Sequence, residues 1–349
     1  MRTSFVILVL SGAAFAQPLA PSIKPTVITL KKESATLEVV ATELSKSSAG
    51  LSVKIEQPEV ARAKFKPTYD GVPLWEALET AADGAKVRLS LRDGGRTVVL
   101  SSPSAGREVS AVNGPFRLVP RTITGRLLLD QGLSFHEIEM DVHWEPRVPV
   151  FRIDSQPKIT KAEDNRGTVL KVETAGSRHY PTTSITDMKV RLSGLTRDTK
   201  KIATLAGEFR ATASERMLAF SFKELAGKFP ITQAEAGVGV TLRSFEKVGG
   251  TWDAVLDLTY PENQPNFESF EEQKWLRDNR LRLIDPNGSI YEPDNDDVIA
   301  SGRRVAATYR FKLLANAVPT AKGWSLICET PGPLSEFTIP FVLKNIPLP

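Results

Sequence analysis

The spacing of hydrophobic residues changes once along the chain, near residue 101. Before this point apolar residues follow both helical and strand spacing, whereas after it they mostly alternate with polar residues. A period of about 3.6 residues is typical of a helix, and alternation is typical of a half-buried strand. The pattern therefore predicts a small α+β domain at 27–101, followed by a body that is nearly all β.

Within the first region the predicted order is β-α-β-β-α-β-β. The strands are expected at 27–30, 51–55, 63–67, 87–91 and 97–100. Each helix is predicted from apolar residues three or four positions apart, which are Leu37, Val40, Ala41 and Leu44 in the first and Leu74, Leu78 and Ala81 in the second. Asp93-Gly94-Gly95 separates the last two strands and indicates a hairpin.

The body is expected to hold two all-β, immunoglobulin-like sandwiches. A Ser-, Gly- and Pro-rich linker at 102–114 comes first and would leave the α+β domain free to move. Turn signals then recur about every 8–12 residues, which predicts sandwiches at 115–227 and 228–349. The second is expected to contain a short helix near 266–279. One strand of the first should bury alternate residues, which are Ile138, Met140, Val142 and Trp144.

The first sixteen residues have the features of a secretion signal. Arg2 gives a positive start, Phe5–Leu10 is an apolar stretch, and Ala14-Phe15-Ala16 before Gln17 fits a cleavage site with small residues. The apolar stretch is shorter than the roughly 20 residues that span a membrane. We therefore expect residues 1–16 to be a signal peptide, and the mature protein to be soluble in the periplasm or outside the cell, without an integral membrane segment.

Two motifs in the first region carry a family resemblance. Gly50-Leu51-Ser52-Val53 follows the first predicted helix, and Gly71-Val-Pro-Leu-Trp-Glu-Ala-Leu78 opens the second. Residues 27–101 resemble the short N-terminal domain of secretins and TonB-dependent receptors, the STN domain. The resemblance implies binding to protein partners or self-association, and it supplies no catalytic residues. The motifs from Trp275 to Pro349 resemble uncharacterised secreted bacterial proteins, to which no activity is attached.

Composition and motifs argue against several classes of function. Apolar residues make up 41% of the chain and charged residues 25%, as in ordinary globular proteins. The net charge of +4 is scattered, so a nucleic-acid surface is not indicated. His136 and His143 should face opposite sides of one strand, and no zinc, nucleophile-elbow or phosphate-loop spacing occurs. We therefore predict no catalytic residue, no metal site and no cofactor.

Several residues remain candidates for binding. Trp75 is the leading partner-binding residue, because it flanks the buried stripe of its helix and is expected to be partly exposed. The acidic stretch 285–297 leaves a calcium loop open as an alternative to a solvated loop. Cys328, the single cysteine, is expected to be a buried, inert thiol. A sugar-stacking face would use exposed aromatic residues, chosen from Trp144, Tyr180, Trp252, Trp275 and Trp324.

The function that fits these features best is a non-enzymatic exported envelope protein, acting as a protein–protein adaptor or scaffold. Its partner would be another envelope protein. The alternative is a secreted carbohydrate- or matrix-binding protein, which an exposed row of aromatic residues would favour and their burial would oppose.

Overall fold

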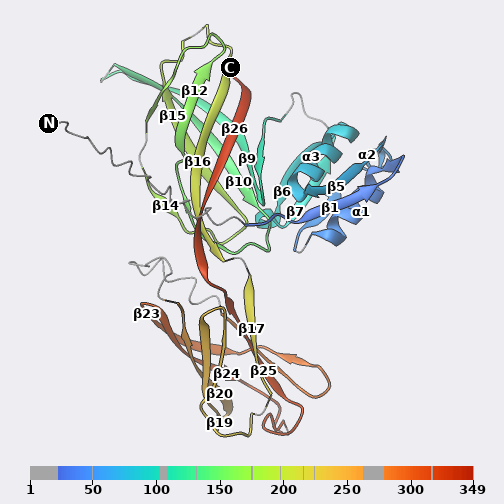
Figure 1. Ribbon diagram of the computed structural model, residues 1–349, viewed down its shortest axis with the longest axis vertical. Helices are drawn as coiled ribbons and strands as arrows, with labels where there is room; N and C mark the ends of the chain where they lie inside the picture. The colour runs from blue at the N-terminus through green and yellow to red at the C-terminus, as the bar shows by residue number, and fades with distance from the viewer. Residues whose placement is uncertain are drawn as a thin grey trace, which may run out of the picture.

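The chain folds into a small α+β module and two β-rich bodies (Figure 1). The computed structural model describes residues 23–48, 50–102, 108–130, 132–173, 176–196, 198–214, 216–223, 225–261, 279–315 and 317–348. The predicted signal peptide at 1–16 and nearly all of the predicted helix at 266–279 lie outside these residues.

The N-terminal module contains three helices among its described residues. In chain order its elements are β1 (Val27–Lys31), β2 (Ala35–Thr36), α1 (Leu37–Ser47), β3 (Ser52–Ile55), α2 (Pro58–Ala61), β4 (Lys64–Phe65), β5 (Thr68–Pro73), α3 (Leu74–Ala85), β6 (Arg88–Arg92), the 3-10 turn η1 (Asp93–Gly95) and β7 (Thr97–Ser101). The strands pair as β3-β7-β6, β1-β5 and β2-β4. Both predicted helical stripes are buried, which confirms their spacing, while β2, α2 and β5 add to the predicted elements.

The first sandwich has two sheets. Their strands are β8 (Ala111–Asn113), β9 (Phe116–Leu128), β10 (Leu133–Trp144), β11 (Val150–Asp154), β12 (Lys158–Asp164), β13 (Lys171–Glu173), β14 (Arg178–His179), β15 (Ile185–Ser193), β16 (Lys201–Ser214) and β26 (Leu334–Pro347). One sheet has the order β13-β15-β10-β9-β8. The other has the order β12-β16-β11-β14, and β26 pairs with β16 along its whole length.

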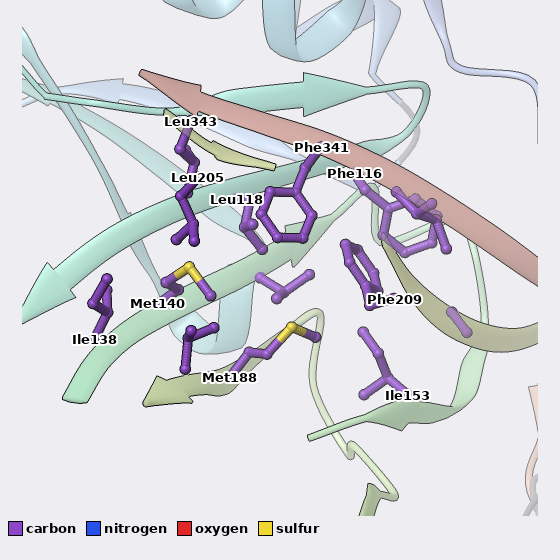
Figure 2. Packing of buried hydrophobic residues seen from close by; sticks show 14 of the residues in the cluster. Phe116, Leu118, Ile138, Met140, Ile153, Met188, Leu205, Phe209, Phe341 and Leu343 are labelled. Carbon is purple, nitrogen blue, oxygen red and sulfur yellow. The ribbon is translucent and has the colours of Figure 1, made fainter. Parts of the chain in front are cut away.

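The core of the first sandwich lies between these sheets. Ile138 and Met140 of β10 belong to the same core as Leu205 and Phe209 of β16, as Figure 2 shows. The alternate residues predicted on β10, which are Ile138, Met140, Val142 and Trp144, are all buried. Phe341 of β26 packs on Phe209, with ring centroids 6.4 Å apart. The last strand of the chain therefore completes the first sandwich.

The second sandwich is formed by the segment between β16 and β26. Its strands are β17 (Met217–Phe222), β18 (Ile231–Glu235), β19 (Val238–Val248), β20 (Thr251–Thr259), β21 (Arg280–Ile284), β22 (Ile290–Tyr291), β23 (Asn295–Ser301), β24 (Arg304–Phe311) and β25 (Ser325–Pro331). They form the sheets β17-β25-β21-β22 and β18-β19-β20-β24-β23, with a shared core.

A two-stranded ribbon connects the two sandwiches. Ser214 of β16 pairs with Leu334 of β26, and Met217 of β17 pairs with Pro331 of β25. Between these pairs the Gly332 amide donates a hydrogen bond to the carbonyl of Arg216 at 2.9 Å. Backbone pairing therefore continues from one sandwich into the other, and the ribbon is visible in Figure 1 where β16 and β26 lead into β17 and β25.

The domain boundaries differ from those expected. The predicted break at 227/228 falls inside the second sandwich, which starts at β17, and β26 belongs to the first. Turn spacing gives the positions of strands, but the choice of sheet is a long-range pairing that spacing does not encode. The predicted linker at 102–114 is partly strand, because Ala111–Asn113 pairs with β9.

Candidate functional site

Trp75 lies at the contact between the module and the first sandwich. Its side chain is 0% exposed, so the expectation of a partly exposed anchor is wrong. The indole Nε1–H donates a hydrogen bond to the carbonyl of Pro115 at 2.9 Å, and the ring lies 6.3 Å from that of His143. Helix α3 thus buries one side in its own module and presents Trp75 to the outer face of the β9–β10 sheet.

Next to Trp75, charged side chains from the module and from the first sandwich form a cluster. The Arg117 side chain on β9 is 1% exposed and donates to Glu79 of α3 at 2.8 Å and to Glu108 at 2.6 Å. Arg121 bonds Glu108 at 3.0 Å and Asp141 at 2.7 Å. Burying a charge is costly unless it is paired, so these carboxylates are needed to hold Arg117 in the interface.

His143 is fully buried beside this cluster. Among the residues that the structure describes, neither ring nitrogen has a hydrogen-bond partner. The Nε2 atom lies 3.6 Å from Oδ2 of Asp141, which is too long for a hydrogen bond but within ion-pair range. Burial lowers the pKa of His143 below its ordinary value, and the positive charges of Arg117 and Arg121 lower it further, against the opposing effect of Asp141. The interface therefore favours the neutral imidazole.

A second polar contact fixes the start of the module. Glu145 is buried and accepts hydrogen bonds from the backbone amide of Thr26 at 2.9 Å and from its hydroxyl at 2.6 Å. Arg147 donates to the same carboxylate at 2.6 Å. The residue that precedes β1 is thus tied to the loop after β10.

The hairpin between β6 and β7 makes the third contact. The carbonyl of Gly94 accepts a hydrogen bond from the amide of Ser184 at 2.9 Å. Gly95 has a φ of +87°, and a Cβ there would lie 2.9 Å from the Ser184 carbonyl oxygen. Glycine is therefore required at this position both for the backbone conformation and for the close approach.

The other candidate residues take structural places. Trp144 and Trp324 are buried, and half-buried Trp252 stacks on Phe245 with centroids 5.4 Å apart. The exposed aromatic row that a sugar face requires is therefore not formed by these residues; Trp275 lies outside the described part. Cys328 is buried as expected, and burial raises the pKa of its thiol to about 12.

In the acidic stretch at 285–297, Asp285 and Asp294 accept hydrogen bonds from backbone amides. Asp285 accepts hydrogen bonds from the amides of Asn287 and Ser289, both at 2.8 Å. Asp294 accepts from the backbone amide of Lys312 at 2.6 Å. Among the described residues, no group of His, Cys, Asp and Glu is arranged to hold a metal ion.

The interface residues were missed because each looks ordinary in the sequence. Arg117 lies in Phe116-Arg-Leu-Val119, four successive buried residues that break the alternation of a half-buried strand. A strand covered on both faces has this pattern. In the sequence the corresponding signal is the adjacent apolar pair Leu118-Val119, which breaks the alternation expected of a strand with one solvent face.

Comparison with known proteins gives no relative. No family model matches the chain, and neither a curated protein nor a solved structure matches it. Among the described residues, no helix is long and apolar enough to cross a membrane.

Proposed function

We propose that the protein is an exported, non-enzymatic adaptor that binds a protein partner of the envelope through its STN-like module. Two immunoglobulin-like sandwiches serve as its body. The observation that carries this proposal is the position of β1. It pairs with β5 on one side and is an end strand of its sheet.

Among the described residues β1 pairs only with β5, and its other side suits the addition of a strand. The carbonyl of Thr26 accepts from Leu74, and the amide of Lys32 donates to Pro67. Bonding alternates along an antiparallel pair, so the backbone groups of residues 27, 29 and 31 point away from β5. An unpaired strand edge is a template for a partner's strand. Val27 is 59% exposed and supplies an apolar contact at this edge.

The body holds this edge in a fixed orientation. The linker was expected to leave the module free, but Trp75, Glu79, Gly94 and Thr26 all contact the first sandwich. A preorganised site loses less conformational entropy on binding. Trp75 is occupied in these contacts, so β1 replaces it as the proposed binding element in the docked state.

Co-purification from the envelope fraction of the source cells tests the proposal. Val27→Lys places a charge on the β1 edge and should remove the partner that the wild-type chain retains. Val39→Lys is the matched control, because Val39 is also an exposed valine, 38% exposed, but belongs to helix α1 and not to strand β1. Loss of the partner with Val39→Lys alone would assign binding to the helix face. Retention by both variants would refute binding through the module edge.

A further inference from the structure

We propose that the contact between the module and the first sandwich is a proton-sensitive lock, closed while His143 is neutral and released when His143 is protonated. This inference does not rest on the proposed function, because it concerns the two parts of one chain. It rests on a buried histidine without hydrogen-bond partners, which lies among fixed positive charges inside a domain contact.

The charges around His143 come from each element packed against it. On its own strand, Asp141 lies 3.6 Å from the ring, and Asp187 of β15 is opposite Asp141 in the register. On β9, Arg117 is opposite His143 in the register, and Arg121 bonds Asp141.

Two further carboxylates contact this cluster from outside the β9–β10 strand pair. Glu79 of α3 and Glu108 each neutralise part of the charge of Arg117. On the module side the His143 ring faces the uncharged indole of Trp75. Glu79, Glu108 and Asp141 are already bonded to Arg117 and Arg121, and Asp141 is the carboxylate 3.6 Å from the His143 ring. A proton on His143 would therefore add a third positive charge to carboxylates that already neutralise two arginines, with an apolar indole on the other side.

The direction of the pH effect follows from these surroundings. The pKa of His143 is lowered in the docked state from an ordinary value near 6.5, which an exposed imidazole regains after release. The released state therefore binds more protons as the pH falls below about 6.5. The ratio of docked to released chains should fall by up to about tenfold for each pH unit, until the pKa of the docked state is reached. Above about pH 7.5 docking should not depend on this group.

Release would change the surface of the module. Trp75 and Val119 are both fully buried in the docked chain, from opposite sides of the contact. Separation would expose the side of the Trp75 indole that contacts His143 and Pro115, while the ring keeps its contacts in the module core. Large aromatic residues are the most effective anchors in protein interfaces. Acidification would thus expose a second surface of the module, the apolar face around Trp75, in addition to the β1 edge.

Hydrogen exchange of the Trp75 indole N–H in the full chain tests the lock. Its resonance is assigned by its loss in Trp75→Phe, and exchange is compared with that of a free indole at each pH. Protection should be constant near pH 7.5 and fall by up to about tenfold per pH unit between 6.5 and 5.0. This range lies above the usual titration of carboxylic acids, near pH 4.

Histidine variants separate the lock from general acid effects. His143→Gln should keep protection at pH 7.5 and lose the pH response, whereas His136→Gln, on the same strand but outside the contact, should retain it. An unchanged response in His143→Gln, or no response in the wild-type chain, would overturn the proposal. If circular dichroism shows that His143→Gln is unfolded, the same exchange measurement on Asp141→Asn tests the proposal instead. This substitution removes a carboxylate that favours the charged ring, so the pKa of docked His143 should fall further. The loss of protection should still begin near pH 6.5, where the released imidazole titrates, but should continue to lower pH than in the wild-type chain, and a loss that ends at the wild-type pH would count against the lock.

Discussion

The first sandwich joins its two neighbours by different kinds of contact. The module docks mainly through side chains, including the buried Trp75, Arg117 and His143, together with one backbone hydrogen bond from Ser184 to Gly94. The second sandwich is joined through a backbone ribbon, in which Ser214 pairs with Leu334 and the Gly332 amide bonds Arg216. Side-chain contacts depend on residue identity and protonation, whereas backbone pairing is nearly independent of both. The module contact is therefore the one that a single side-chain substitution can alter while the backbone pairing stays in place.

The largest effect is expected from Trp75→Ala. Truncating a fully buried aromatic residue costs about 3–5 kcal/mol and here also removes the hydrogen bond to Pro115. Native-state hydrogen exchange should show this loss in α3, with no change in β16 and β26. Trp75→Phe keeps most of the apolar volume and should cost about 1–2 kcal/mol through the lost hydrogen bond. An equal loss in β16 would show that the two junctions are coupled, against the comparison.

A smaller effect is expected when the ribbon is disturbed. In Gly332→Ala the new methyl group would lie 2.9 Å from the backbone oxygen of Arg216 and 3.2 Å from the hydroxyl of Ser214. The strain should cost about 1–3 kcal/mol, seen as a lower melting temperature by calorimetry. Gly250→Ala is the control, because nothing lies within 4 Å of its Cβ position. A neutral Gly332→Ala would mean that the ribbon adapts, and the contrast with the module contact would weaken.

The smallest effects sharpen the difference between buried and exposed ion pairs. Glu79→Gln removes one carboxylate partner of buried Arg117 and should weaken module docking by about 1–2 kcal/mol. Asp70→Asn removes the exposed pair with Lys31, which should change stability by less than about 1 kcal/mol. Exchange of the Trp75 indole N–H reports the first change, and thermal melting reports the second. If Asp70→Asn cost more free energy than Glu79→Gln, burial would be refuted as the reason why the interface ion pairs are stronger.

Features that depend on neighbouring residues could be predicted from the sequence, whereas features that depend on contacts between distant segments could not. The helical stripes and the alternation on β10 are local, because neighbouring residues fix which face is buried, and both predictions are confirmed. The partial exposure of Trp75 was predicted from the module's own helix. The prediction is wrong because Trp75 packs into the core of the module and its remaining side contacts Pro115 and His143. The predicted boundary at 227/228 differs from the sheet pairing. The chain leaves the second sandwich after β25, and its last strand, β26, pairs with β16 of the first sandwich.

The sequence by itself determined the periodicity of the elements, the mostly β character of the body and the burial of Cys328, because each depends on hydrophobic spacing along a short segment. Only the tertiary structure decided that the second sandwich is inserted between β16 and β26. It alone also brought Glu79, Arg117 and His143 into one buried contact. Residues this far apart in the chain meet through the sum of many packing and pairing energies, and no local spacing records that sum.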